Sequence, residues 1–262
     1  MRALSIGATG MEAQQLNVEV IANNIANLST TGFKRSRTEF QDLLYQNMRS
    51  VGSASSDTGT ILPSGLQVGL GVRPAATYRI NSQGNLTVTS NPLDLAVNGL
   101  GFFQVQLPDG TTAYTRAGSL QLNATGQIVN ADGYTILPSI TVPSTATSLS
   151  VNASGQVTAT IAGQTAQQTL GQLQLANFVN PAGLDAIGNN LLKETQASGT
   201  PTTGNPQSSS FGAIVQGSLE TSNVDVVSEV TNLISAQRAY EMNSKVIKTA
   251  DEMLNAANQT KG

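Results

Sequence analysis

The C-terminal segment from 223 to 258 repeats large apolar residues at a strict interval of seven. These residues are Val226, Leu233, Tyr240, Ile247 and Leu254. The segment contains neither Gly nor Pro, and such a repeat indicates a long α-helix with one continuous apolar stripe. At about 1.5 Å per residue the helix would be roughly 50 Å long, too long to lie against one small domain. It therefore needs a partner of similar length.

The N-terminal segment offers such a partner. Leu4, Met11, Val18 and Ile25 are again seven residues apart, and smaller apolar residues widen their stripe. We predict that the two terminal helices pair through these nine residues as a coiled-coil core, which would be the assembly seam. The alternative is two ordinary amphipathic helices packed on a globular core, but repeats of seven over this length favour a seam.

Both predicted helices carry residues that weaken them. Gly7 and Gly10 each cost roughly 1 kcal/mol relative to Ala in a helix. The C-terminal helix places Gln237, Ser244 and Asp251 at seam positions. Polar seam residues lower stability but fix register and oligomeric state. We therefore expect the helices to order fully only against neighbouring copies of the chain.

Side-chain amides gather near the end of the N-terminal helix. Asn23, Asn24 and Asn27 are poor helix formers, so they indicate either fraying or hydrogen bonds to other chains. Together with Gln237 and Arg238 they are our candidates for polar contacts between subunits.

The composition excludes several classes of function. The absence of Cys and His rules out disulfides, thiolate and His-based metal sites, and Ser-His-Asp catalysis. A net charge of −3 gives no reason to expect nucleic acid as a partner. The one basic cluster, Lys34, Arg35 and Arg37, is interpreted as a solvated or interface edge. No cofactor or metal is expected.

Between the terminal segments the sequence is typical of β structure. Only Asp132 is charged between Ala117 and Leu184. Residues 80–86, 122–128 and 151–157 share one pattern: aliphatic, Asn, two small or polar residues, Gly, amide, aliphatic. This pattern predicts hairpin turns, as does Pro108-Asp109-Gly110.

Three segments are predicted without regular packing. Residues 38–48 carry apolar side chains at helical spacing, although the segment is short enough to be an extended arm instead. Residues 50–65 and 198–210 are rich in Gly, Ser, Thr and Pro, and we predict loops or linkers there.

The predicted fold class is α+β, with a β-rich domain of hairpins or a barrel-like sheet inserted between paired terminal helices. The predicted parts are an N-terminal core helix, an extended arm with a loop, an outer β-rich domain and a C-terminal core helix. Their boundaries are 1–34, 35–78, 79–217 and 218–262. No signal peptide or membrane span is recognisable, so export would need a route that leaves the N-terminus uncleaved.

Four stretches resemble the rod and hook family of axial proteins of the bacterial flagellum. ANNIANLSTTGFK at Ala22 to Lys34 and the stretch from Ser222 to Leu254 are similar to the terminal signatures of that family. Residues 62–105 and 114–138 are similar to its distal-rod branch. The resemblance implies a non-enzymatic subunit that polymerises helically into a stiff hollow drive shaft, which transmits torque to the hook and lines the export channel.

The resemblance also implies partners and a location. The subunit would form a homo-oligomeric tube in the periplasm-spanning basal body, without membrane insertion. It would be exported by the flagellar type III apparatus. It would contact proximal rod proteins, the hook protein, the P- and L-ring bushing and the rod cap. Residues 50–65 are similar to a stretch that stiffens the distal rod, and this assigns a rod-stiffening loop to Ser50, Gly52, Ser56, Leu62, Pro63 and Gly65.

Other interpretations stay open at this point. A proximal rod or hook subunit belongs to the same structural class. A secreted adhesin would be a folded monomer that does not polymerise. A wall-degrading enzyme would need paired carboxylates in a cleft, whereas the middle of the chain offers only scattered Asp94, Asp109 and Asp132.

Overall fold

The computed structural model describes residues 2–49, 64–163, 166–208 and 210–259. The chain divides into two compact units, each described by itself below. The helix unit comprises Met1–Ile25, Ser36–Tyr78 and Val226–Gly262, and the β unit comprises Ala26–Arg35 and Arg79–Asp225. Two terminal helices and a β-rich middle make the fold α+β, as the sequence predicted.

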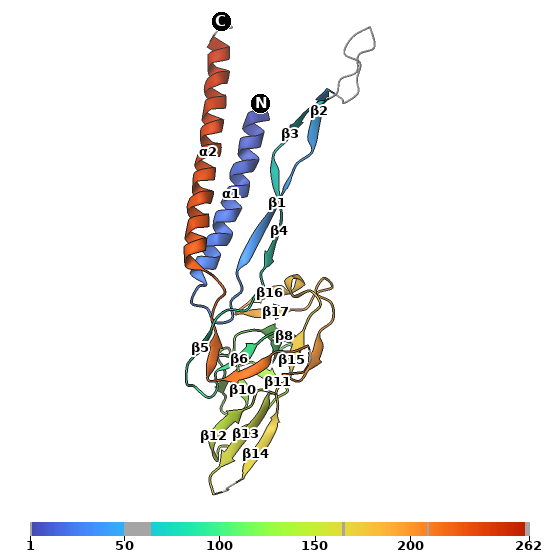
Figure 1. Cartoon of the computed structure of the whole chain (residues 1–262), viewed down its shortest axis with the longest axis vertical. Helices are drawn as coiled ribbons and strands as arrows, with labels where there is room; N and C mark the ends of the chain where they lie inside the picture. Colours follow the sequence, from blue (N-terminus) through green and yellow to red (C-terminus); the bar gives the residue numbers. More distant parts are fainter. Residues whose placement is uncertain (1, 50–63, 164–165, 209, 260–262) are drawn as a thin grey trace. The chain divides into compact units, whose positions relative to one another are not determined.

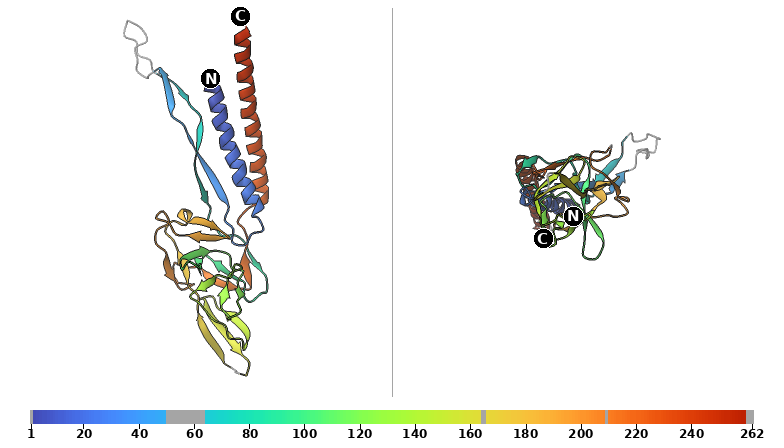
Figure 2. Two further views of the ribbon diagram at one scale, coloured as in Figure 1. Left: turned by 180° about the vertical axis from the view of Figure 1, so that it is seen from behind. Right: turned by 90° about the horizontal axis from the view of Figure 1, so that it is seen from below.

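The helix unit is built on two antiparallel helices, α1 (Arg2–Ala26) and α2 (Val226–Gln259), which lie side by side (Figures 1 and 2). A Cβ atom added at Gly7 would lie 2.9 Å from Cγ1 of Ile247, and one at Gly10 would lie 2.8 Å from Nδ2 of Asn243. The two glycines weaken α1 as an isolated helix, but they let the backbone of α1 approach α2 closely.

A two-part β arm completes the helix unit. β1 (Ser36–Asp42) pairs with β4 (Val72–Arg79), and beyond them β2 (Tyr45–Arg49) pairs with β3 (Leu66–Gly69). The 38–48 segment is therefore an extended arm and not a helix. The arm packs on α1, because a Cβ atom at Gly71 would lie only 2.2 Å from Oγ1 of Thr9.

The β unit holds one branched nine-stranded sheet. Its main path runs β16-β17-β8-β7-β11-β10-β9, while β15 pairs with β7 and β18 pairs with β15. The bounds are β7 (Phe102–Gln106), β8 (Thr112–Thr115), β9 (Gln121–Leu122), β10 (Ile128–Val129), β11 (Thr135–Leu137), β15 (Leu175–Asn177), β16 (Asp185–Gly188), β17 (Leu191–Lys193) and β18 (Thr202–Gly204).

Smaller sheets surround it. β12 (Ala146–Val151), β13 (Gln156–Ile161) and β14 (Gln167–Gln172) form a meander of three strands. β6 (Leu95–Asn98) pairs with β19 (Ala213–Gln216), and β5 (Leu86–Val88) pairs with β20 (Ser218–Glu220). A short 3-10 helix spans Pro181–Gly183. The sheets are open, and the described residues form no closed barrel.

Successive side chains of β7 point to opposite faces of the sheet, so they enter two separate hydrophobic clusters of the β unit. Phe103 and Val105 are fully buried in the main cluster, whereas the neighbouring Phe102 belongs to a second cluster. In that second cluster the ring of Phe178 lies edge-on to the rings of Phe102 and Tyr114, with centroids 6.1 and 4.8 Å away. The sequence predicted short strands and hairpins in this charge-poor region, and the structure has them.

Most of the predicted turns form, and one does not. The 122–128 and 151–157 stretches close as loops in which Asn123 and Asn152 accept hydrogen bonds from backbone N–H groups four residues on. Pro108 to Gly110 joins β7 to β8. Residues 80–85, with the same pattern, are extended. The prediction was wrong there because the segment leads into β5, which pairs with the distant β20.

The predicted 198–210 linker is partly ordered structure. β18 pairs with β15 across Thr202 to Gly204, and Ser198 is buried and hydrogen-bonded to Thr195. Composition alone misjudged this segment, because a strand added to a sheet needs few apolar side chains of its own.

Candidate assembly interface

Small and polar side chains form the contact between α1 and α2. Asn24 is buried and donates to Oε2 of Glu229 at 3.3 Å and to the carbonyl oxygen of Ser36 at 2.9 Å. The N–H of Ser36 donates back to Oδ1 of Asn24 at 2.8 Å. Together with the contacts of Gly7 and Gly10, this pair fixes an antiparallel register that runs along both helices.

The buried stripe of α2 consists of Glu229, Ala236 and Ala250, which are again separated by multiples of seven. It lies three residues from the predicted seam. Of the predicted residues on α2, Leu233, Ile247 and Leu254 are half-buried, while Val226 and Tyr240 are 40% and 42% exposed. They therefore flank the buried stripe.

The predicted seam residues of α1 have the same character. Leu4, Met11, Val18 and Ile25 are all half-buried. The fully buried positions of α1 are Gly7, Ala13, Ile21 and Asn24. The role of the nine residues as a seam between subunits stays a prediction.

The predicted polar contacts divide into two groups. Asn24 uses its side chain within the helix unit, as described above. Asn27 is half-buried and accepts a hydrogen bond from the hydroxyl of Thr30. Asn23, Gln237 and Arg238 are exposed. Contacts of these five side chains with another subunit remain a prediction.

An exposed apolar stripe, here called the outer stripe, runs along α2. Its residues recur at spacings of three, four, seven or eight, and their side chains are 40% to 74% exposed. The outer stripe consists of Val227, Val230, Ile234, Met242, Val246 and Met253. Val227 and Ile234 each precede a buried residue, Glu229 or Ala236, by two positions. Two residues are about 200° apart around a helix, so this part of the stripe faces away from α1.

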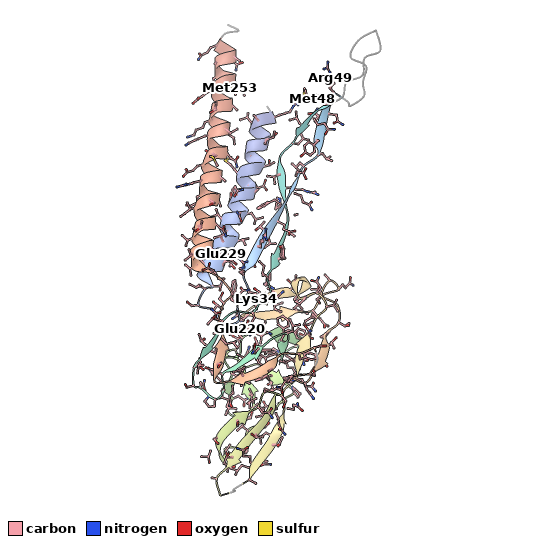
Figure 3. All side chains as sticks on the ribbon, in the orientation of Figure 1. Lys34, Met48, Arg49, Glu220, Glu229 and Met253 are labelled. Atoms are coloured by element: carbon pink, nitrogen blue, oxygen red, sulfur yellow. The ribbon has the colours of Figure 1, made fainter. Side chains whose placement is uncertain are left out.

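The arm carries a second group of exposed apolar residues. Leu44, Tyr45, Met48 and Leu66 are each more than half exposed, and Met48 lies with Arg49 at the end of β2 (Figure 3). Of the predicted rod-stiffening loop, Ser50, Gly52, Ser56, Leu62 and Pro63 lie outside the described residues. Gly65 directly precedes β3 and is half-buried.

A buried ionic cluster, here called the clasp, lies in the β unit and consists of Lys34, Arg116 and Glu220. Nζ of Lys34 donates to Oε1 of Glu220 at 2.5 Å, and Nε of Arg116 donates to Oε2 at 2.6 Å (Figure 3). The side chain of Glu220 is completely buried. Oε1 also accepts the backbone N–H of Gly84 at 2.9 Å.

The other hydrogen bonds donated by Lys34 and Arg116 go to backbone carbonyl oxygens. Lys34 donates to Ser82 at 2.8 Å, and the guanidinium of Arg116 donates to Val97, Gly99 and Gly101.

Burial alone would raise the pKa of the Glu220 carboxyl. The charge of Arg116, with the hydrogen bonds from Lys34 and Gly84, instead holds this pKa below its ordinary value.

The clasp joins three passages of the chain through one point. The N–H of Gly32 donates to the carbonyl of Glu220 at 2.8 Å, so the segment after α1 is fixed to β20. Oδ1 of Asn223 accepts the N–H of Arg35 at 2.7 Å, and its Nδ2 donates to the carbonyl of Ile80 at 2.8 Å. The segments that lead into and out of the β unit are therefore tied together.

Sequence reasoning missed this cluster and misjudged Lys34. The sequence predicts Lys34 to be part of a solvated or interface edge, whereas in the structure it is 6% exposed and ion-paired. The available signal was the isolation of Arg116 and Glu220 in a charge-poor β region, where a charge must find a partner if it is buried. Glu229 and Asn243 of the helix contact were missed too, because we sought apolar residues there.

Neither helix described in the structure has the length and apolarity needed to cross a membrane. Within the described ranges, no three or more acidic side chains gather in a way that could hold a metal ion. The features that stand out are therefore the helix pair, its uncovered apolar surfaces and the clasp.

Comparison with known proteins places these features in context. Residues 4–34 match the family described as flagella basal body rod protein, and residues 96–159 match the D1 domain of flagellar hook protein FlgE/F/G. Residues 215–260 match the C-terminal family of flagellar basal body rod FlgEFG proteins. The first and last matches cover α1 and α2, and the middle one lies in the β unit.

Full-length relatives agree with these matches. The chain is 57% identical to the flagellar basal-body rod protein FlgG of Caulobacter vibrioides, over 99% of both chains. It is 53% identical to FlgG of Agrobacterium fabrum over 97% of both chains. It is 41% identical to FlgG of Bacillus subtilis, again over 97% of both chains.

Proposed function

This chain belongs to the family of flagellar basal-body rod proteins, and from that premise we propose that it is a structural subunit of the flagellar distal rod whose terminal helices polymerise with those of neighbouring copies. Its place is the flagellar basal body, where it assembles with other rod and hook proteins. The role is mechanical: a helical tube of identical chains transmits torque and encloses a channel. A heterologous contact repeated from copy to copy gives an open-ended tube rather than a closed ring.

The observation that carries this proposal is the outer stripe of α2. Six large apolar side chains lie along one helix, and the described residues of the chain leave at least 40% of each exposed. Soluble monomers rarely expose a contiguous apolar surface of this kind. A neighbouring copy offers a surface of the same helical character, and the half-buried seam residues would be covered with it.

The energy balance favours many contacts over one. Fully burying an exposed apolar side chain of this size contributes about 1.5 to 3 kcal/mol. The six side chains are only 40% to 74% exposed, so covering three of them yields about 2 to 5 kcal/mol. Association costs an estimated 4 to 15 kcal/mol in lost freedom of motion. One pairwise contact is therefore marginal, whereas a subunit in a helical tube touches several neighbours at once. The subunit would thus be stable in the tube and weakly associated in solution.

Ile234→Asp tests the proposal. Purified full-length chain, raised in concentration, should form straight hollow tubes visible by electron microscopy and sedimenting as polymer. The Ile234→Asp variant should remain unassembled at concentrations at least about tenfold higher, because a carboxylate would have to be buried in the contact. A chain lacking residues after Gly217 should not assemble at all.

Asn258→Asp is the matched control, because it adds the same charge at an exposed position near the C-terminal end of α2, outside the outer stripe. Its assembly should equal that of the unchanged chain. If Ile234→Asp assembles at the unchanged concentration, the outer stripe is not the polymer contact. If the full chain stays monodisperse at every concentration and also on preformed rod ends, self-assembly through the helices is refuted and the adhesin interpretation gains weight.

We extend the proposal to the partners that family membership suggests. The chain would reach its site by the flagellar type III export apparatus without cleavage of its N-terminus. In place, it would contact proximal rod proteins at one end, the hook protein at the other, the P- and L-ring bushing around it, and a rod cap during growth. The 50–65 segment would stiffen the tube through contacts between copies.

A further inference from the structure

A groove beside the helix pair combines two acidic side chains with an aromatic ring. It has a volume of about 530 Å³ and is lined by Gln15, Val18, Glu19, Gln237, Tyr240 and Glu241. α1 and α2 contribute three residues each, so the groove exists only when the two helices are paired. We call it the acidic groove.

The two carboxylates of the acidic groove have no cationic partner. Among the described residues, neither Glu19 nor Glu241 forms an ion pair, and Glu19 accepts one hydrogen bond, from Gln15 at 3.1 Å. Two carboxylates give the lining of the groove a negative charge, which a cation would complement. The groove thus favours a positively charged occupant.

The aromatic ring narrows the choice of cation. Tyr240 is 42% exposed and lies between Gln237 and Glu241 on the groove side of α2. A guanidinium group stacks on an aromatic face and pairs with a carboxylate through two parallel hydrogen bonds, whereas an ammonium does neither as well. The chemistry of the groove is therefore that of an arginine site.

Arginines of the required kind lie on the arm. The described strands of the arm carry four arginines and no lysine; Arg37, Arg49 and Arg73 are exposed, whereas Arg79 at the end of β4 is half-buried. Arg37 forms no hydrogen bond or ion pair with a described residue, and Arg73 makes one hydrogen bond, to Oε1 of Gln41 at 3.3 Å. Arg73 is next to Pro74, which lines a neighbouring pocket together with Glu19 of the same chain, but among the described residues neither Arg37 nor Arg73 is ion-paired with Glu19 or Glu241 there. The exposed arginines on the arm of a second copy complement the charge of the acidic groove.

We propose that the acidic groove receives an arginine of the arm, Arg37 or Arg73, from a second copy of this chain. This rests on the proposed self-assembly and identifies one of its contacts. The contact joins the arm of one subunit to the helix pair of its neighbour, in addition to the apolar contact along the outer stripe. It would also make assembly depend on prior pairing of α1 with α2.

Charge reversal with rescue tests the proposal. Glu241→Arg should raise the concentration needed for assembly about tenfold or more. A second reversal in the same chain, Arg37→Glu or Arg73→Glu, should bring it back to within about threefold of the unchanged value. Glu252→Arg, the same reversal at an exposed position of α2 outside the groove, should have little effect. Rescue by either arginine supports the proposal, and rescue by neither overturns it.

Crosslinking supplies a readout that does not depend on stability. The chain has no Cys, so introduced thiols react without background. Chains with Gln237→Cys in the groove and differently sized chains with Glu39→Cys beside Arg37 should form a mixed disulfide when assembled together. Asn232→Cys, on another face of α2, should not form one with the same partner.

The outcomes separate this inference from the proposed function. Polymers that form without the mixed disulfide, and that tolerate Glu241→Arg, refute the arginine contact and leave self-assembly standing. If no polymer forms under any condition, both are refuted.

Discussion

Replacing Glu220 with Gln is expected to lower the free energy of unfolding of the β unit by about 3 to 5 kcal/mol, because it breaks a buried ion pair on one side only. Glu220 accepts three hydrogen bonds: from Lys34 at 2.5 Å, from Arg116 at 2.6 Å and from the Gly84 N–H at 2.9 Å. Gln keeps the shape but loses the charge, and its amide N–H₂ points at one of these donors.

The magnitude follows from what remains behind. Lys34 and Arg116 are 6% and 7% exposed, so water cannot replace the lost carboxylate. Hydrogen bonds to charged groups contribute about 1.5 to 3 kcal/mol each. In two of the three bonds to Glu220, those from Lys34 and Arg116, both the donor and the acceptor are charged. The carbonyl oxygens around Arg116 and Lys34 still accept hydrogen bonds from the two cations in the variant. The expected loss of unfolding free energy therefore stays below the full sum for the two charged bonds.

The assay is urea denaturation of the full chain at concentrations below assembly. Near-UV circular dichroism of the tyrosines follows the β unit, where Tyr114 is buried. A double-mutant cycle with Lys34→Met isolates the pair, because Lys34→Met removes the cation that Glu220→Gln leaves unpaired. The double variant should be more stable than the sum of the single losses predicts, by at least about 1 kcal/mol.

Glu252→Gln, at an exposed position of α2, is the control and should change stability by less than about 0.5 kcal/mol. A loss below 1 kcal/mol for Glu220→Gln, or additive effects in the cycle, would show that the three charges do not act as one buried cluster. The geometry would then have been overinterpreted.

Three further outcomes are expected from the β unit. The pKa of Glu220 is lower in the folded chain than its ordinary value of 4.5. Its contribution to stability is therefore fully present above pH 4.5 and is lost as the pH falls through the pKa of the folded state. The urea midpoint should thus fall less between neutral and acid pH for Glu220→Gln than for the unchanged chain. Gly118→Ala should prevent folding of the β unit, because the new Cβ would lie 1.5 Å from the carbonyl oxygen of Leu95. Gly133→Ala has open space around the new Cβ but a φ of +85°. It should lower the free energy of unfolding by only about 1 to 2 kcal/mol in the same denaturation assay. Phe103→Ala removes a fully buried ring and should lower the unfolding free energy by about 3 to 5 kcal/mol, without abolishing the helical signal at 222 nm.

The sequence predicted the helices and the β-rich middle because both rest on local periodicity. It could not tell which of two stripes on α2 meets α1, since Leu233 and Ala236 each belong to a series with the same interval of seven. In the structure the buried residues of α2 belong to the series of Ala236, while Ile247 of the other series also packs against α1, at Gly7. Gly7 and Gly10 permit a close approach that large side chains would prevent.

The clasp could not be predicted for a different reason. Lys34, Arg116 and Glu220 are far apart in the chain, and each looks like an ordinary charge in its own neighbourhood. Only the pairing of β5 with β20 brings Gly84 and Glu220 together. The same pairing explains why the Gly84 stretch is extended although its sequence resembles two genuine turns. Long-range strand pairing leaves no periodic trace in the sequence.

The way the chain threads through the clasp determines a load path. Tension applied through the two terminal segments meets first at Gly32, Arg35 and Asn223, whose hydrogen bonds to neighbouring strands lie beside the ion pairs of Glu220. Force on the two terminal segments would therefore reach one small group of hydrogen bonds and ion pairs within the β unit. The meander of β12, β13 and β14 contributes no residue to these hydrogen bonds and ion pairs. It can gain or lose residues without altering how force passes through the subunit, so length changes should be tolerated there while the clasp is kept.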